Sequence, residues 1–408
     1  MRSSLAGKAV ALVVLALLCV QACSSQPTKE KPDLRSPAPS APYLGNRGYA
    51  LPDSPFTRKG TVVTATCSMG ARYAAVSVQA WDPETWRPRA ERQFPIPSDA
   101  AFTNYPGAKA VNSPLVDLCG VSPDAPSPYP VDSLEYTAPR VRALFDLAFT
   151  RMAVVLRDPG SRTTSHVGFV RSGADQDAAV RLGGAAGGDE QNAVMSPDGR
   201  RVWFTYTADG KQRIGSRAVE GDHRLSDEGP ATGHGLPLTV SGKPARAVQG
   251  NMVNIAPNGR RLTANAPKVF GNVFDTWNSS GPLTGASAHG ATLLSGCVGV
   301  VGWIGDDRVL CRTSSGSFRA MNARTGRAAG APIGVVGRQD GTVAEGMVMS
   351  ADGKRFIVSV HLPNGRQREV DGFEHPDFRV VPTTPGGSAP VSISNDLLST
   401  DTVFLEWR

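Results

Sequence analysis

The chain has 408 residues, of which 44 are Gly and 32 are Pro, while only 19% are charged. A helical bundle would use more Glu, Lys and Leu, so this composition favours a turn-rich, all-β protein. The formal net charge of +7 is spread thinly, and Lys and Arg nowhere cluster with interleaved aromatic residues, which argues against nucleic acid as a partner.

Residues 1–22 have the layout of a signal peptide. Arg2 and Lys8 are the only charges ahead of an apolar run, Ala9 to Val20, that is too short to span a bilayer comfortably. The sequence therefore predicts export from the cytoplasm.

Val20, Gln21, Ala22 and Cys23 resemble a bacterial lipobox. In lipoproteins the cysteine of this motif receives diacylglycerol, the chain is cut before it, and the new N-terminus is acylated, for example with palmitate. Gln21 departs from the pattern, because that position favours a small or apolar residue. The resemblance implies a lipid anchor at Cys23 on the extracytoplasmic face of the cell membrane, where two or more acyl chains hold a protein almost irreversibly. Ordinary cleavage to a freely secreted protein is the alternative.

Residues 23–59 form a segment that is rich in Ser and Pro and poor in β-branched residues. Such a segment predicts an extended tether of about 3 Å per residue. An ordered arm is the alternative near Tyr43 to Leu51, where aromatic and apolar residues return. Residues 60–408 are then the folded domain.

A strand, turn and strand pattern recurs from Met195, Ile255 and Met349. The turns contain Asp-Gly or Asn-Gly, which tolerate the positive φ that two-residue hairpin turns require. These turn residues are Asp198, Gly199, Asn258, Gly259, Asp352 and Gly353. A second turn follows at Asp209-Gly210 or Asn364-Gly365, which predicts strands of about seven to nine residues.

A weaker copy begins at Trp303, with turns at Asp306-Asp307, Ser315-Gly316 and Thr325-Gly326. Three turns predict four strands. The copies begin roughly 45 to 60 residues apart, which is typical of the blades of a β-propeller. Between Val116 and Val180 the pattern blurs, and either one short helix with a strand or two strands would fit there, within at least one blade.

The pattern S-P-D-G-R-R from Ser196, with its relatives, resembles the WD-like repeat of TolB-type β-propellers over about Val62 to Arg408. The resemblance implies an all-β propeller of four-stranded blades, in which the Pro-Asp-Gly turn joins the innermost two strands. We expect six or seven blades, with the final TVFLEWR strand completing a blade begun near Thr61. The chain shows no separate domain ahead of the repeats, so the role of TolB in outer-membrane assembly is not carried over.

Four cysteines remain if Cys19 leaves with the signal peptide and Cys23 is lipidated. They are Cys67, Cys119, Cys297 and Cys311. An even number outside the cell indicates disulfides. Three pairings are possible, and we favour 67 with 119 and 297 with 311 because each pair lies in its own region. These cysteines do not have the C-x-x-C spacing or the neighbouring histidines of a metal site.

Common catalytic and cofactor motifs are missing from the sequence, including G-x-S-x-G, H-E-x-x-H and the phosphate-binding glycine loop with lysine. We therefore assign no catalytic residue, cofactor or metal. Glu135, Asp146 and Asp158 are candidates for the acid and base of a propeller glycosidase, although solvated or capping roles are commoner.

Two segments combine tryptophan with polar neighbours, as surfaces that bind sugars or peptides do. They contain Trp81 and Trp86, and Asp275 and Trp277. Packing between blades is the alternative for these side chains. Most of the histidines are expected in loops.

These features together predict a membrane-anchored, extracytoplasmic lipoprotein. Its propeller would bind an envelope protein, a peptide or an envelope polymer such as a glycan through loops on one face. A propeller-fold hydrolase or lyase that acts on extracellular carbohydrate is the alternative, and a membrane-tethered spacer is a third possibility.

Overall fold

The regular secondary structure of the described part of the chain is almost entirely β-strand. The computed structural model describes residues 52–69, 74–101, 113–119, 137–159, 164–176, 178–183, 189–230, 238–240, 243–245, 252–256, 261–270, 273–282, 292–335, 342–361, 368–370, 373–375, 377–399 and 401–408. The helices within these ranges are η1 (Pro55–Thr57), α2 (Ser113–Cys119) and α3 (Thr137–Arg142). None of the described helices is long and apolar enough to cross a membrane.

Within these ranges, antiparallel strands form six sheets of three or four strands. The first sheet has the order β26-β1-β2-β3, with β1 at Val62–Met69, β2 at Ala74–Trp81, β3 at Pro88–Pro95 and β26 at Val403–Trp407. The second sheet has the order β4-β5-β6, at Arg151–Arg157, Ser165–Arg171 and Val180–Arg181. The third has the order β10-β9-β8-β7, with β7 at Gln191–Met195, β8 at Arg201–Ala208, β9 at Lys211–Ala218 and β10 at Ser226–Pro230.

The second half of the chain supplies the other three sheets. The fourth contains β13 (Met252–Ile255), β14 (Arg261–Phe270), β15 (Val273–Pro282) and β16 (Thr292–Leu293) in that order. The fifth contains β17 (Cys297–Ile304), β18 (Arg308–Thr313) and β19 (Phe318–Asn322). The sixth contains β20 (Val343–Met349), β21 (Arg355–His361), β24 (Asp377–Pro382) and β25 (Val391–Ser392). Two hairpins lie apart from these sheets, β11 (Leu238–Val240) with β12 (Lys243–Ala245), and β22 (Arg368–Val370) with β23 (Phe373–His375).

The turn between β7 and β8 shows why the sequence motif recurs. Ser196 Oγ donates to Asp198 Oδ1 (2.7 Å) and accepts from the backbone N of Arg201 (2.9 Å). The carboxylate of Asp198 also accepts from the backbone N of Arg200 at 3.1 Å. Gly199 has a φ of 69°, in the left-handed region that favours glycine. Each residue type of the motif therefore has a role in the turn.

The turn between β20 and β21 has the same construction. Ser350 Oγ donates to Asp352 Oδ1 (2.7 Å) and accepts from the backbone N of Arg355 (3.0 Å). Gly353 has a φ of 68°. The motif thus joins the first two strands of the third and sixth sheets, as the resemblance implied. Asn258 and Gly259 lie outside the described residues.

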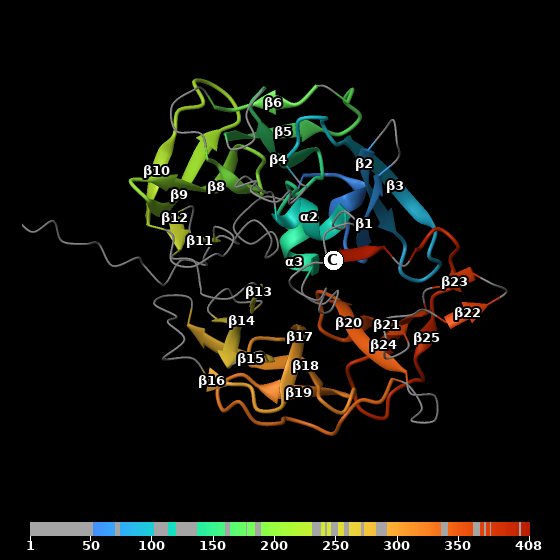
Figure 1. The fold of residues 1–408 in the computed structure, drawn as a ribbon. Coiled ribbons are helices and arrows are strands. Elements are labelled where there is room, and N and C mark those ends of the chain that lie inside the picture. The colour runs from blue at the N-terminus through green and yellow to red at the C-terminus, as the bar shows by residue number, and fades with distance from the viewer. Residues whose placement is uncertain are drawn as a thin grey trace, which may run out of the picture. The chain divides into compact units, whose positions relative to one another are not determined.

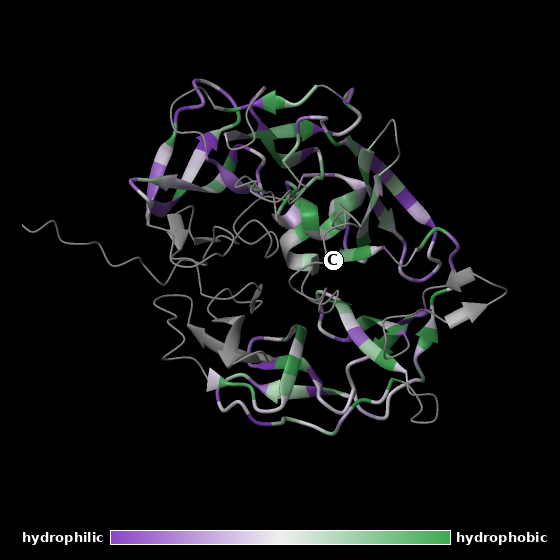
Figure 2. Ribbon diagram, viewed as in Figure 1, coloured by the Kyte–Doolittle hydropathy of each residue, from purple (hydrophilic) through white to green (hydrophobic). Residues whose placement is uncertain are grey.

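Contacts join the first sheet to the second and the second to the third, and they join the fourth, fifth, sixth and first sheets in turn. β17 contacts β13, β15 and β20; β20 contacts β26; and β4 contacts β7. Figure 1 shows β17 and β20 nearer the middle of the arrangement than β19 and β25. The α2 helix toward the middle is largely apolar, whereas the outer strand β3 is mostly polar and exposed over its first six residues (Figure 2). Antiparallel sheets that follow one another in this way define a β-propeller.

The last strand closes the first sheet. β26 pairs with β1 from Trp407 opposite Val62 to Val403 opposite Ala65, which confirms the predicted role of the TVFLEWR segment. The backbone N of Ala351 in the sixth sheet donates to Trp407 O at 2.9 Å. The sixth sheet is therefore joined to the first.

The weaker repeat from Trp303 differs from its prediction, since its sheet contains three strands rather than four. After the turn at Thr325-Gly326 the chain makes only single bridges, from Ala328 to Met321 and from Ile333 to Phe318. The third turn returns the chain to β19 without a continuous fourth strand. In the blurred segment before β4, the structure has α2 and α3 followed by the second sheet.

Candidate functional site

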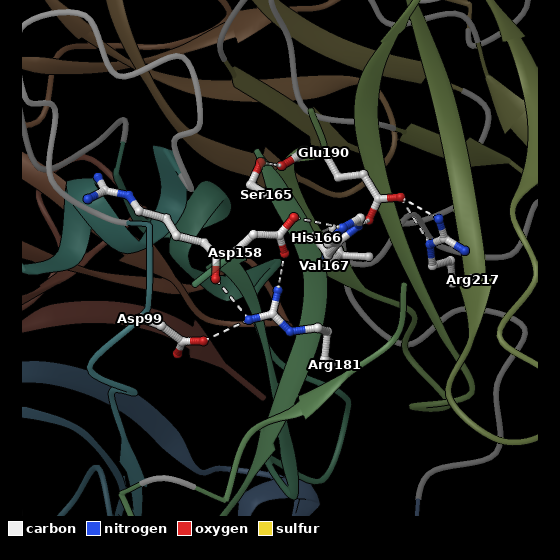
Figure 3. A network of polar contacts seen from close by, with 9 residues as sticks. Asp99, Asp158, Ser165, His166, Val167, Arg181, Glu190 and Arg217 are labelled. Carbon is white, nitrogen blue, oxygen red and sulfur yellow. Dashed lines mark hydrogen bonds and ion pairs between the residues drawn. The ribbon is translucent and has the colours of Figure 1, made fainter. Parts of the chain in front are cut away.

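His166, on β5, lies at the centre of a polar network that is buried on the side of Glu190 and Arg217 and partly exposed on the side of Asp158 and Arg181. Its side chain is 3% exposed, with Nε2 at 3.3 Å from Asp158 Oδ2 and Nδ1 at 3.8 Å from Glu190 Oε2. Figure 3 shows the imidazole between the two carboxyl groups. His166 is not one of the loop histidines that the sequence led us to expect, because it lies on β5, which is buried along nearly its whole length.

Glu190 connects the second and third sheets. Its Oε1 accepts from Nε and Nη2 of Arg217 at 3.0 Å and 2.6 Å, and its Oε2 accepts from the backbone N of Val167 at 2.8 Å. Ser165 Oγ donates to the backbone O of Glu190 at 2.8 Å. Arg217 lies on β9, while Ser165 and Val167 lie on β5, so this one residue joins two sheets.

Arg181, on β6, occupies the other side of the network (Figure 3). Its Nη1 donates to Asp158 Oδ1 at 2.6 Å, and its Nη2 donates to Asp99 Oδ2 at 2.9 Å and to the backbone O of Arg157 at 2.8 Å. One guanidinium therefore connects the end of β4 with the segment that follows β3.

The network is arranged to hold sheets together. All four carboxylate oxygens of Asp158 and Glu190 face a donor or the imidazole. Among the described residues, His166 Nδ1 has no hydrogen-bond partner, and a Cβ built on Gly183 would lie 2.7 Å from it. Glycine is required where the backbone passes this close. In the part of the chain that the structure describes, no group of three His, Cys, Asp or Glu could hold a metal ion.

Of the acidic residues considered as an acid and base, two are in the described ranges. Asp146 caps a turn, because its Oδ1 accepts from the backbone N of Thr150 (2.6 Å) and of Arg151 (3.2 Å). Asp158 belongs to the His166 network. These two carboxylates share no partner in the described residues, and both accept hydrogen bonds that stabilise the fold. Glu135 lies outside the described residues.

The tryptophans of the first sheet pack in the core. Trp81 is fully buried, and its Nε1 donates to Thr64 Oγ1 at 2.8 Å. Trp86 packs against the same apolar cluster, and its backbone O accepts from Asn395 Nδ2 at 2.6 Å. Packing between sheets therefore accounts for both. Asp275 and Trp277 lie on β15, whose side chains are outside the described part of the structure.

Two disulfides join the cysteine pairs that the sequence spacing favoured. Cys67 on β1 is bonded to Cys119 at the end of α2, with 5.0 Å between the Cα atoms. Cys297 on β17 is bonded to Cys311 on β18, with a Cα separation of 5.3 Å. The first bond links the segment between two sheets to a strand, whereas the second lies within one hairpin. Cys23 lies outside the described residues.

The helices α2 and α3 lie against strands of different sheets. α2 contacts β1 and β7, and α3 contacts β26 and β13. Figure 1 places both helices toward the middle of the sheets. The sequence allowed for a short helix here but gave no signal for this position, because neither helix is long enough to show a clear hydrophobic period.

An ion pair holds α3 to the last strand. Arg142 is 2% exposed, and its Nε donates to Glu406 Oε2 at 2.8 Å while its Nη1 donates to the backbone O of Phe145 at 2.9 Å. Arg408 Nε donates to the other oxygen of Glu406 at 2.7 Å. Burial alone would raise the pKa of the Glu406 carboxyl, but Arg142 and Arg408 outweigh it and hold this pKa below its ordinary value.

No protein-family model and no curated protein matches the chain. Among solved structures, TolB from Acinetobacter baumannii is similar at 13% identity, covering 82% of this chain and 69% of that one, with a TM-score of 0.31. A putative 6-phosphogluconolactonase from Bacteroides fragilis is similar at 11% identity, covering 84% and 83%, with a TM-score of 0.32. Prolyl oligopeptidase B from Galerina marginata is similar at 7% identity, covering 86% and 41%, with a TM-score of 0.36.

Proposed function

We propose that this protein is a lipid-anchored binding module on the extracytoplasmic face of the cell membrane. Cys23 carries the acyl chains, residues 23–59 act as the tether, and the propeller binds an envelope protein, a peptide or a glycan. The observation that carries this proposal is a lipobox-like sequence ahead of a disulfide-bonded propeller. Disulfides are typical of proteins that work outside the cytoplasm.

The contacts of the acidic residues Asp146, Asp158 and Glu190 favour binding over chemistry. Asp146 caps the turn before β4, and Asp158 and Glu190 hold neighbouring sheets together through arginines. A general acid or base must reach a substrate proton, and these carboxylates face scaffold groups instead. The rigid arrangement of sheets is suited to presenting loops for recognition.

The proposal includes six blades of a TolB-type propeller. Six sheets of three or four strands occur in the described ranges, and the first is completed by the last strand of the chain. A fold closed by pairing its first and last strands has few exposed sheet edges, which suits a protein held at high local concentration on a membrane.

Cross-linking on living cells tests this function. Tagged wild-type protein, Cys23→Ala and Cys19→Ala are expressed at equal levels, cross-linked from outside the cell, and the captured material is identified by mass spectrometry. Cys19 lies inside the predicted signal peptide, so its substitution is the matched control. We expect wild type and Cys19→Ala to stay with the membrane and to capture the same envelope component, while Cys23→Ala is released or uncleaved and loses it.

Two results would overturn the proposal. Membrane retention of Cys23→Ala equal to that of wild type would show that Cys23 does not carry the lipid anchor. If the wild-type protein captures no component but turns over a purified cell-envelope polysaccharide, the protein is a carbohydrate-active enzyme rather than a binding module.

A further inference from the structure

We propose that one end of the sheets is a docking surface for the phosphate groups of an anionic lipid bilayer. This end is the one at which β1 begins, and we call it the entry end because residues 52–61 lead into the first sheet there. The surface is argued from the charges of the folded domain and does not depend on Cys23.

Turns from five sheets meet at the entry end. The backbone N of Leu147, in the turn before β4, donates to Pro197 O at 2.9 Å, and Arg408 Nη2, just after β26, donates to Leu147 O at 3.5 Å. The turn between β20 and β21 is hydrogen-bonded to the end of β26, and a Cβ built on Gly353 in this turn would lie 3.3 Å from Ile304 Cα at the end of β17. The turns of the third, second, first, sixth and fifth sheets therefore lie side by side.

Cationic side chains without an ion pair gather at the entry end. They lie in the turns between the first two strands of a sheet, or in loops that the antiparallel pairing brings to the same end, ahead of β1 and β3 and after β19. All of them are exposed, and none makes an ion pair or a side-chain hydrogen bond with another described residue. They are Arg58, Lys59, Arg87, Arg200, Arg308 and Arg327.

Many carboxylates at the entry end are already paired. Asp82 forms an ion pair with Arg89, and Glu84 forms one with Arg355 at 2.8 Å. In the described ranges, the exposed carboxylates of this end that have neither an ion pair nor a side-chain hydrogen bond are Asp53 and Asp175. The unpaired cations therefore leave this end with an excess of positive charge.

The opposite end of the sheets has the reverse charge. Asp209 lies in the turn between β8 and β9, and Asp396 and Asp401 lie between β25 and β26. All three are exposed and make no ion pair with another described residue. Lys211 is an exposed cation at this end. The two ends thus differ in charge, which gives an anionic surface a preferred side on which to dock.

The path of the chain favours a bilayer as the partner. Residues 52–61 lead into β1 at the entry end, so the segment proposed as the tether joins the folded domain on its cationic side. The negative potential of an anionic bilayer attracts exposed Lys and Arg and falls off within about a Debye length, so these side chains have to lie close to the lipid. Cations that have no partner break no ion pair when they dock. The closeness to the bilayer rests on the proposed lipid anchor, whereas the affinity for anionic lipid does not.

Co-sedimentation with vesicles tests the surface. Full-length Cys23→Ala, which lacks the proposed acylation site, is mixed with vesicles of phosphatidylcholine alone or with phosphatidylglycerol added. We expect binding to rise with phosphatidylglycerol and to weaken at high salt, and we expect Arg200→Glu/Arg308→Glu in the same background to bind at least about tenfold more weakly. Any binding through residues 1–22 is common to both proteins. Binding that ignores phosphatidylglycerol, or that is equal for the two proteins, would overturn the surface.

A variant with restored net charge separates the position of the charges from their sum. Adding Asp396→Lys/Asp401→Lys to Arg200→Glu/Arg308→Glu returns the net charge to its original value but places the new cations at the opposite end. We expect vesicle binding to stay weak, and its recovery would show that net charge alone attracts the lipid. If the entry-end substitutions abolish binding of soluble polyglutamate but leave vesicle binding unchanged, the partner is an acidic polymer and the lipid surface is wrong.

Lysine labelling of the wild-type protein on vesicles needs no variant that could fail to fold. Lys59 lies at the entry end and Lys211 at the opposite end, and both are exposed. The membrane-bound protein is treated with a water-soluble acetylating reagent, and both sites are quantified by mass spectrometry. We expect phosphatidylglycerol to slow the labelling of Lys59 at least about threefold and to leave Lys211 unchanged. Equal labelling of Lys59 with and without phosphatidylglycerol would overturn the surface. If wild type carries no acyl chains, the proposed anchor fails, while the vesicle result with Cys23→Ala still decides the surface.

Discussion

Arg142 and Glu406 lie 264 residues apart in the sequence and form an ion pair in which Nε and Oε2 are 2.8 Å apart. The pair joins α3, which precedes the second sheet, to the last strand of the chain. Their side chains are 3% and 14% exposed, so water screens the pair weakly. It therefore fixes the closing strand against the centre of the fold.

Glu406→Gln is expected to destabilise the protein by about 3 kcal/mol or more, because removing one partner of a buried ion pair leaves the remaining charge uncompensated. Two arginines, Arg142 and Arg408, lose their carboxylate. Arg142→Gln should have a smaller effect, since Glu406 keeps Arg408. Urea unfolding measures both. A loss for Arg142→Gln that equals or exceeds that of Glu406→Gln would contradict this assignment.

Acid should weaken the fold through the same carboxyl group. The pKa of Glu406 is lowered from its ordinary value of 4.5, so its contribution to stability is complete above that value and is lost as the pH falls through the folded-state pKa. A hydrogen bond from Arg89 likewise lowers the pKa of Asp82 to about 2, and one from Ser350 lowers that of Asp352. Urea midpoints measured from about pH 6 to about pH 3 should fall, and they should fall less steeply in Glu406→Gln. If the urea midpoints of the two proteins fall in parallel with pH, Glu406 is not a source of the pH dependence.

The two disulfides should differ in their effect on stability. Cys67 and Cys119 are 52 residues apart, whereas Cys297 and Cys311 are 14 apart. The entropy of closing these loops in the unfolded chain corresponds to about 4 and about 3 kcal/mol. Cys67→Ser/Cys119→Ser should therefore lower the unfolding free energy by more than Cys297→Ser/Cys311→Ser. The reverse order would show that folded-state packing around the hairpin disulfide outweighs loop length.

Gly183 and His166 should behave as a coupled pair. A Cβ at position 183 would lie 2.7 Å from His166 Nδ1, so Gly183→Ala has to displace the imidazole from Asp158 and should cost about 1–3 kcal/mol. In a His166→Ala background the methyl group meets no ring, and the same substitution should be nearly neutral. A double-mutant cycle by urea unfolding measures the coupling. Additive effects would mean that the backbone around Gly183, just after β6, shifts rather than the histidine.

Much of the fold could be predicted from local chemistry. Asp198-Gly199 and Asp352-Gly353 occupy the predicted turns, because the serine, aspartate and glycine of the motif each satisfy a requirement of the turn itself. The final strand was also predictable, since an apolar segment at one end of a repeat array needs a partner at the other.

The polar contacts between sheets could not be predicted. His166, Glu190 and Arg217 come together from β5, the start of β7 and β9, and no sequence spacing encodes such a meeting. The sequence also could not show that no continuous fourth strand follows Thr325-Gly326. A turn sequence specifies that the chain reverses, but it does not specify how far the next segment stays paired. The positions of Trp81 and Trp86 also depend on packing, which composition leaves open.

The pairing of β1 with β26 means that the first sheet can be completed only after the end of the chain is available. β1 ends at Met69 and its partner begins at Val403, so this edge of β1 has no partner until nearly the whole chain has been synthesised. During that interval the unpaired edge and the apolar cluster around Phe404 are open to other chains. Closure of the first sheet would come last, because β1 and β26 have the longest sequence separation among the paired strands that the structure describes.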